Sequence, residues 1–122
     1  MTSQAKVLIV EDERMIAEYF RVVVENLGYD VCGIAATADE AVRLAEEKDP
    51  ALVFMDVRLI GERDGVDAAI DIYNRKPVPM IYVTGSQEPE TLQRIRTDHP
   101  TDVLIKPVFE AQLKEMLDKY CG

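Results

Sequence analysis

Short apolar runs alternate with longer amphipathic segments along the whole chain. Four runs are continuously apolar, over residues 7–10, 51–55, 80–83 and 103–105. Runs of this kind are typical of strands that are covered on both faces in a parallel sheet. Residues 29–35 are a fifth strand candidate, a weaker one because Asp30 and Gly33 interrupt its apolar pattern.

The segments between the strands have helical periodicity. The first carries an apolar stripe, ahead of the stop signal Gly28, made of Ile16, Phe20, Val23 and Leu27. In the second, Thr37 and Glu40 have the spacing of a capping box. The small side chains of this second helix form a stripe of Ala38, Ala41, Val42 and Ala45.

Three further helices are expected. The third covers about residues 66–73. Residues 88–97 offer only Leu92 and Ile95 as anchors, so this fourth helix should be the least firmly packed. The fifth has an apolar stripe of Phe109, Leu113, Met116 and Tyr120. The connection over residues 57–65 is long and polar, and long loops between a strand and a helix are often functional.

Five strands that alternate with five helices predict an α/β fold with a doubly wound parallel sheet. A length of 122 residues is near the commonest size of one domain, so residues 1–122 are expected to form a single domain without an output domain. Ligands of such sheets bind outside the carboxyl ends of the strands. The residues at those ends are therefore the candidates for chemistry.

Four of the five predicted strands are followed by polar side chains. Glu11 and Asp12 follow the first strand and Asp56 the third, whereas Thr84 follows the fourth and Lys106 the fifth. Each of them alone has an ordinary explanation as a helix cap or a turn residue. Because parallel strands share one carboxyl edge, however, we expect all five side chains to converge.

Three carboxylates beside one lysine carry a local formal charge of about −2, which favours a bound cation. Oxygen ligands without His or Cys favour Mg²⁺ over Zn²⁺. Mg²⁺ held by carboxylates neutralises the oxygens of a transferring phosphoryl group, and a carboxylate is itself a nucleophile that forms an aspartyl-phosphate. Asp56 is the candidate nucleophile, and Lys106 and the Thr84 hydroxyl are candidate partners of the phosphoryl oxygens.

At these positions the sequence resembles the receiver domain of two-component response regulators, over essentially the whole chain. The matching segments are Val10-Glu11-Asp12, Met55-Asp56, Asp64-Gly65, Val83-Thr84-Gly85 and Ile105-Lys106-Pro107. The resemblance implies a flavodoxin-like doubly wound (βα)5 fold whose five-stranded parallel sheet has the order 2-1-3-4-5. It also implies a phosphoacceptor that is not an enzyme and that signals by phosphorylation-dependent protein–protein interaction. Because the sequence shows neither a membrane span nor a signal peptide, a cytoplasmic location is expected.

The resemblance also implies a role for each site residue. Asp56 would accept a phosphoryl group from a sensor histidine kinase or a histidine phosphotransfer protein, and the phosphorylated chain, a monomer or weak dimer, would act on a further protein. Thr84 would be the switch hydroxyl, and Lys106 would contact the phosphoryl group. The bond between Lys106 and Pro107 would be cis. The Mg²⁺ ligands would be Glu11 through water, Asp12, Asp56 and the main-chain carbonyl of Arg58.

Two features depart from the family pattern. Receivers usually carry an aromatic residue three positions before the lysine, where this chain has Val103, so we expect phosphorylation to be read out differently. Tyr82 is a possible substitute, although its pattern also fits a buried strand aromatic. The loop after Asp56 lacks the Met-Pro of many receivers, and Arg58 would either shield the phosphoryl group, orient a water or serve only as a loop charge.

Composition and charge exclude other classes of protein. The chain has 14 Lys and Arg against 23 Asp and Glu, and its formal charge of −9 has the wrong sign for binding nucleic acid or an anionic membrane. The apolar runs are too short to span a membrane, and the first residues lack the layout of a signal peptide. Cys32 and Cys121 are too few for a disulfide scaffold and are expected to be reduced thiols.

Three alternative functions share parts of this pattern. A flavodoxin-type electron carrier needs a phosphate-cradling loop after the first strand, where Glu11, Asp12 and Glu13 would repel a phosphate. A phosphohydrolase of the haloacid dehalogenase type has a second Asp two residues after its nucleophile, where this chain has Arg58. The third alternative is a receiver-like interaction module that binds partners without phosphorylation, and the residues do not exclude it.

Overall fold

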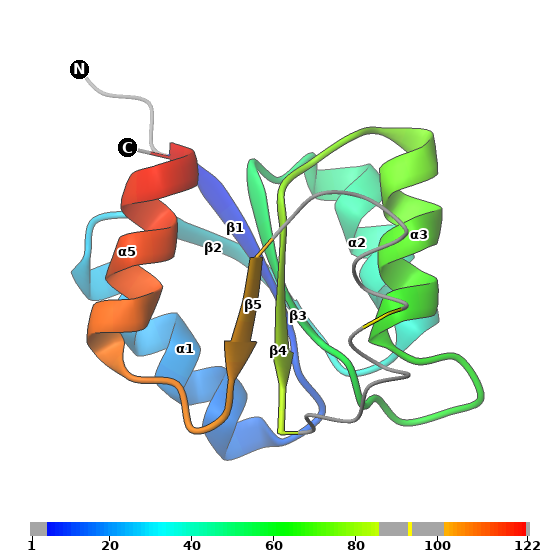
Figure 1. Ribbon diagram of the computed structural model, residues 1–122. Helices are drawn as coiled ribbons and strands as arrows, with labels where there is room; N and C mark the ends of the chain where they lie inside the picture. Colours follow the sequence, from blue (N-terminus) through cyan, green and yellow to red (C-terminus); the bar gives the residue numbers. More distant parts are fainter. Residues whose placement is uncertain (1–4, 86–92, 94–101, 122) are drawn as a thin grey trace.

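The computed structural model describes residues 5–85, 93 and 102–121 (Figure 1). In chain order these residues form β1 (Lys6–Val10), α1 (Arg14–Asn26), β2 (Asp30–Ala35), α2 (Ala38–Lys48), β3 (Leu52–Asp56), α3 (Gly65–Arg75), β4 (Met80–Thr84), β5 (Asp102–Ile105) and α5 (Glu110–Cys121). All five expected strands are confirmed. The fourth helix expected over residues 88–97 falls, apart from Gln93, outside the described residues.

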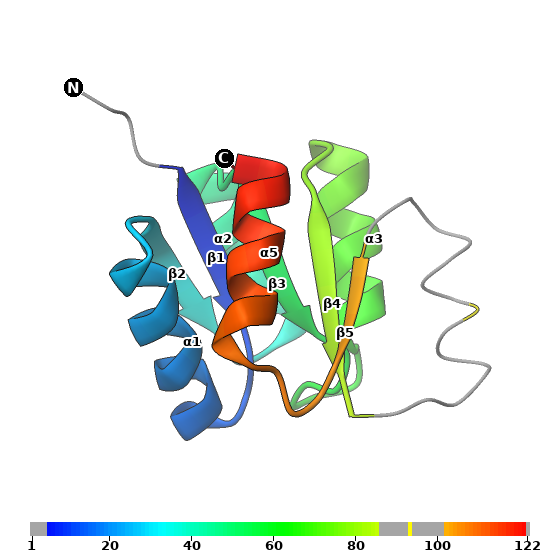
Figure 2. The same cartoon turned by 60° about the vertical axis from the view of Figure 1, so that its left-hand side comes forward.

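The five strands form one parallel sheet of order β2-β1-β3-β4-β5, as the resemblance implied. Helices α1 and α5 cover one face of this sheet, and α2 and α3 cover the other (Figures 1 and 2). The chain leaves β1 toward β2 on one side and returns to β3 on the other. The strand order therefore reverses at β1, where doubly wound sheets bind their ligands.

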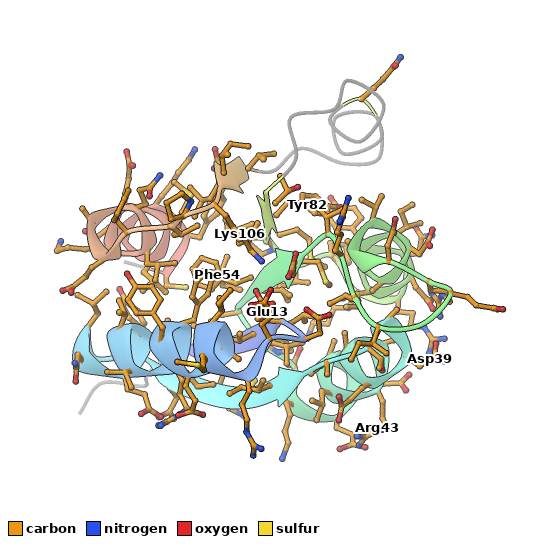
Figure 3. The ribbon with its side chains drawn as sticks, turned by 90° about the horizontal axis from the view of Figure 1, so that it is seen from below. Glu13, Asp39, Arg43, Phe54, Tyr82 and Lys106 are labelled. Carbon is orange, nitrogen blue, oxygen red and sulfur yellow. The ribbon has the colours of Figure 1, made fainter. Side chains whose placement is uncertain are left out.

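The core lies in two layers, one on each face of the sheet. All residues of β3 and β4 are buried, which explains why their sequences are apolar without alternation. Phe54 packs in the layer beneath α1 and α5, whereas Tyr82 packs in the layer beneath α2 and α3 (Figure 3). Tyr82 is fully buried, which confirms its interpretation as a buried strand aromatic.

The ends of the first two helices follow their sequence signals with one difference. Helix α1 is followed by Gly28, whose φ of 95° suits a glycine. At the start of α2 the Thr37 hydroxyl accepts a hydrogen bond from the Glu40 N–H at 3.1 Å. The Glu40 carboxylate, however, accepts from the N–H of Ala36 at 2.8 Å, so the reciprocal half of the expected capping box is displaced by one residue.

The last two described helices differ in extent from the expectation. Helix α3 begins one residue before the expected residues 66–73, where a capping box of Asp64 and Asp67 fixes its start, and it ends two residues after them. The placement of Phe109 on the buried stripe of the last helix is wrong. Phe109 precedes α5 and is 63% exposed; its carbonyl accepts a hydrogen bond from the N–H of Leu113 at 3.2 Å, so Phe109 contributes its main chain to the start of the helix and not its side chain to the buried stripe.

Two further expectations can be checked on the described residues. Cys32 and Cys121 are free thiols, both half-buried, and burial raises the pKa of each. No helix within the described ranges is long and apolar enough to cross a membrane.

Candidate functional site

The carboxyl ends of four strands bring the predicted site residues together at one edge of the sheet. Glu11 follows β1, Asp56 ends β3, Thr84 ends β4 and Lys106 follows β5. Glu11, Asp56 and Thr84 are at most 4% exposed. A cleft of about 460 Å³ opens at this edge and is lined by Asp12, Glu13, Asp56, Arg58, Thr84, Gly85 and Lys106. Figure 3 looks onto this edge and shows Lys106 pointing inward.

Lys106 connects the first and third strands electrostatically. Its Nζ lies 3.0 Å from Oδ2 of Asp56 and 3.1 Å from Oε1 of Glu11. The Lys106 N–H donates to the carbonyl of Thr84 at 2.8 Å and so continues the pairing of β4 with β5. The bond between Lys106 and Pro107 is cis, as the resemblance implied. These contacts place an ammonium group directly against the candidate nucleophile.

Main-chain N–H groups hold the other carboxylate oxygens. Oδ1 of Asp56 accepts a hydrogen bond from the N–H of Arg58 at 3.2 Å. In the same way, Oε2 of Glu11 accepts from the N–H of Glu13 at 3.0 Å. Each of the two buried carboxylates therefore has one oxygen toward Lys106 and the other on the main chain two residues later. This double anchoring fixes the orientation of both groups.

Glu11, Asp12 and Asp56 form a cluster of oxygen ligands. One carboxylate oxygen from each of them lies within 4.8 Å of the other two. Lys106 balances one of the three negative charges, and the cluster contains neither nitrogen nor sulfur ligands. This donor set fits a hard divalent cation such as Mg²⁺.

Burial and charge shift the protonation of the site in opposite directions. Burial raises the pKa of Glu11 to about 7, with further contributions from the neighbouring Asp56 carboxyl group. Burial also opposes the charged form of Lys106, but hydrogen bonds and the charges of Asp56 and Glu11 outweigh it and raise the pKa of Lys106. At neutral pH the lysine is therefore a cation, whereas the Glu11 carboxylate is more easily protonated than an exposed glutamate.

The raised pKa of Glu11 predicts a pH-dependent stability in Mg²⁺-free buffer. Between its ordinary value of 4.5 and about 7, Glu11 holds more proton in the folded than in the unfolded chain. Raising the pH through this window should therefore lower the free energy of unfolding, by roughly 1–3 kcal/mol from this group. Urea denaturation of wild type and Glu11→Gln at several pH values measures the contribution. Glu13→Gln, which changes an exposed carboxylate, should keep the wild-type slope; an equal slope in Glu11→Gln would contradict the assignment.

Gly65 has a role that the sequence pattern does not reveal. Its N–H donates to the carbonyl of Val57 at 2.7 Å. A Cβ at this position would overlap the main-chain oxygen of Asp56 and lie 2.8 Å from its carbonyl carbon. The start of α3 therefore packs directly on the main chain of Asp56. The available signal was the Asp64-Gly65 pair just before the predicted third helix, since glycine is an unfavourable residue at the start of a helix.

Val103 occupies the position where receivers usually carry an aromatic residue. It pairs with Tyr82 between β4 and β5, is half-buried and packs against the core layer beneath α2 and α3. The branched side chain of Val103 thus serves as a core residue beside a buried ring.

Comparison with known proteins agrees with this geometry. Residues 7–118 match the family model described as response regulator receiver domain. The chain is 34% identical to the phyllosphere-induced regulator PhyR of Methylorubrum extorquens, over 93% of this chain and 42% of PhyR. It is 36% identical to the transcriptional regulatory protein PdtaR of Mycobacterium tuberculosis, over 84% of this chain and 49% of PdtaR. The chain thus spans about half the length, or less, of these two relatives.

Solved structures give the same result. The signal receiver domain of a modulated diguanylate cyclase from Desulfovibrio desulfuricans G20 superposes with a TM-score of 0.90 at 37% identity, over 97% of this chain and 94% of that domain. The fold and the strand order agree with a family match that covers nearly the whole sequence. The chain therefore belongs to the response regulator receiver domain family of two-component signalling.

Proposed function

We propose that this chain is a phosphoacceptor that takes a phosphoryl group onto Asp56, with the help of Mg²⁺, and signals by phosphorylation-dependent protein–protein interaction. Response regulator receiver domains are in general signalling proteins rather than enzymes. The observation that carries the proposal is the buried Asp56 carboxylate at an open cleft, held between Lys106 and two further carboxylates. An aspartate with a purely structural role would not need an open cleft, a lysine and two further carboxylates around it.

The side chains at the cleft have complementary roles in this proposal. An Asp56 oxygen attacks the phosphorus of a phosphohistidine, the new P–O bond forms, the P–N bond breaks, and its electron pair leaves with the imidazole. Lys106, a cation beside Asp56, balances charge on the transferred group. Thr84, which ends the neighbouring strand, donates its hydroxyl to another phosphoryl oxygen. Arg58 lines the mouth of the same cleft.

The acidic cluster is the proposed Mg²⁺ site. Receiver domains bind Mg²⁺ at an acidic site, and Glu11, Asp12 and Asp56 provide such a site here. The main-chain carbonyl of Arg58 is a further proposed ligand, because Arg58 follows Asp56 closely and lines the cleft. The bound ion supplies neutralisation of phosphoryl oxygens. Asp56 itself is oriented by the Arg58 N–H and by Lys106.

The proposed partners are proteins. A sensor histidine kinase or a histidine phosphotransfer protein supplies the phosphoryl group, and a separate protein target responds to it. The net charge of −9 argues against direct binding to nucleic acid or to anionic lipid. The phosphoryl group carries about 1.5 to 2 negative charges and replaces the single charge of the Asp56 carboxylate, so the cleft gains about 0.5 to 1 negative charge, which Lys106 and Thr84 are placed to sense.

Labelling by acetyl phosphate tests this function. In the presence of Mg²⁺ the wild-type chain should gain about 80 Da, the mass of one phosphoryl group, with a matching shift on a phosphate-affinity gel. Removing Mg²⁺ with EDTA should slow labelling by about tenfold or more, because the three carboxylates then repel the incoming phosphate. A folded wild-type chain that stays unlabelled with Mg²⁺ would instead favour the interaction module that works without phosphorylation.

A further inference from the structure

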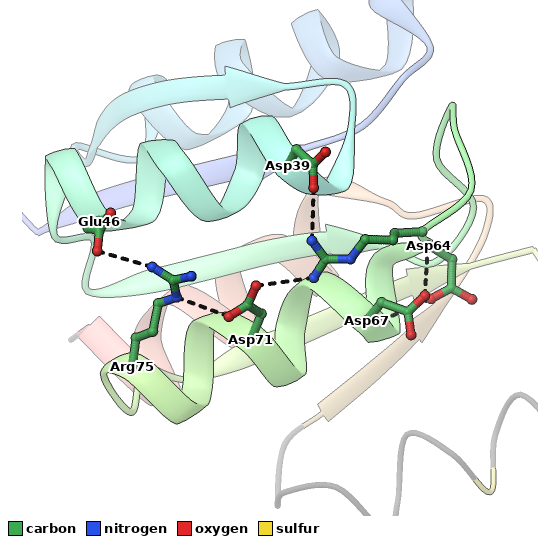
Figure 4. Close-up of polar contacts among 7 residues, drawn as sticks. Asp39, Glu46, Asp64, Asp67, Asp71 and Arg75 are labelled. Atoms are coloured by element: carbon green, nitrogen blue, oxygen red, sulfur yellow. Dashed lines mark hydrogen bonds and ion pairs between the residues drawn. The ribbon is translucent and has the colours of Figure 1, made fainter.

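A network of ion pairs ties the loop after Asp56 to two helices (Figure 4). Arg63 lies in the loop over residues 57–64, which we call the β3–α3 loop. Its Nη1 lies 2.8 Å from Oδ1 of Asp39 in α2, and its Nη2 lies 3.2 Å from Oδ2 of Asp71 in α3. The other oxygen of Asp71 contacts Arg75 at 3.0 Å, and Arg75 reaches Glu46 of α2 at 3.2 Å.

The two arginines share Asp71 but differ in where they lie. Arg75 lies in the last turn of α3, far along the chain from the cleft residues. Arg63 instead lies in the same loop as Arg58, whose N–H donates to Oδ1 of Asp56. Between them Leu59 packs against the core, and Ile60 forms a parallel bridge with Thr37. The loop is thus held at its start by Asp56, in its middle by Thr37 just before α2, and at its end by Arg63 together with the Asp64 capping box.

The end of the β3–α3 loop depends on polar contacts to keep its position. Gly61, between the Ile60 bridge and Arg63, has a φ of 107°, a conformation that favours glycine. The loop segment at Gly61 and Glu62 is exposed, so core packing does not hold it. The side chains of Arg63, Asp71 and Asp39 are 40%, 30% and 85% exposed, so these pairs contribute little to global stability. The effect of the Arg63 ion pairs is instead local, because they hold the β3–α3 loop against α2 and α3.

We propose that Arg63 is a positioning residue for Asp56: its guanidinium bridges α2 and α3, fixes the β3–α3 loop, and so holds the Arg58 N–H against the Asp56 carboxylate. The effect on phosphorylation rests on the proposed function, whereas the effect on the loop does not. A planar guanidinium can contact two carboxylates on different helices at once, which a single ammonium group does less well. Small displacements of a nucleophile cost large factors in rate.

Labelling rates test the effect on the site. With Mg²⁺ and acetyl phosphate, Arg63→Gln should label about 3- to 10-fold more slowly than wild type. The matched control Arg75→Gln removes the same charge from the same Asp71 and should stay within about 1.5-fold of wild type. Arg63→Lys keeps the charge but loses the two-armed contact and should remain slow. Equal rates in Arg63→Gln and Arg75→Gln, or full recovery in Arg63→Lys, would overturn the proposal.

Hydrogen exchange tests the loop independently of phosphorylation. Peptides that cover residues 57–64 should exchange about 2- to 5-fold faster in Arg63→Gln than in wild type, whereas Arg75→Gln should leave them unchanged. Unchanged exchange in Arg63→Gln would refute the positioning role even if labelling slowed. If wild type is never labelled, the proposed function fails, and the exchange rates still decide whether Arg63 fixes the loop.

Discussion

Replacing Asp56 by asparagine is expected to abolish labelling by acetyl phosphate, with a fall in rate of at least about 100-fold. The amide has no nucleophilic carboxylate oxygen, but its carbonyl oxygen can still accept a hydrogen bond from Lys106 or from the Arg58 N–H. The substitution also removes one of three converging negative charges. The variant should therefore fold at least as stably as wild type in Mg²⁺-free buffer, and mass spectrometry should detect no gain.

The matched control for this prediction is Asp118→Asn. Asp118 lies on the surface of α5, where it pairs with Lys114 and is more than half exposed. The same change of Asp to Asn at this position should leave labelling unchanged. Undiminished labelling of Asp56→Asn would assign the phosphoryl group to another residue, and peptide mapping of the labelled chain would then locate it.

Replacing Gly65 by alanine is expected to destabilise the chain by about 3 kcal/mol. Helix propensity favours alanine over glycine and would predict a small gain in stability. The added Cβ, however, would overlap the main-chain oxygen of Asp56, and a backbone neighbour cannot move aside as a flexible side chain does. Either α3 or the end of β3 must shift, so we also expect slower labelling of Asp56. Urea denaturation and the acetyl phosphate assay measure the two effects.

Gly85→Ala is the matched control for the clash. A Cβ at Gly85 would have no atom within 4 Å among the described residues, and Gly85 does not have the positive φ that favours glycine. This substitution should change the free energy of unfolding by less than about 0.5 kcal/mol. Similar losses in both variants would contradict the clash with Asp56 as the cause, because the effect of Gly→Ala on the unfolded chain is to raise stability rather than to lower it.

The strands were predictable because each leaves a local signal. Residues buried on both faces must be apolar without alternation, and the runs in β1, β3 and β4 follow that rule to within a residue. The ends of helices were less certain. Phe109 fits a helical stripe by spacing alone, yet it is 63% exposed, because periodicity does not say where a helix begins. Glu40 similarly bonds one residue away from its expected partner.

In the candidate site, too, some features could be predicted from the sequence and others could not. The identity of Glu11, Asp12, Asp56, Thr84 and Lys106 follows from strand ends and residue type, since parallel strands must end on one edge. The contacts that orient these side chains could not be predicted from the sequence. Lys106 bonds Asp56 across 50 positions of sequence, and the Arg58 N–H reaches the second oxygen of the same carboxylate. Arg63 gave no signal, because its carboxylate partners lie on two different helices.

The sequence by itself determined the strands, their parallel arrangement and the polar groups at their ends. Each strand that is buried on both faces must be a short apolar run, and parallel strands place their following residues at one edge of the sheet. Only the tertiary structure decided how those groups are held. Gly65 must lack a side chain because the start of α3 meets the main chain of Asp56, and Arg63 spans two helices that are adjacent only after folding. Contacts between distant segments depend on packing distances of a few ångströms, which no local pattern of residues encodes.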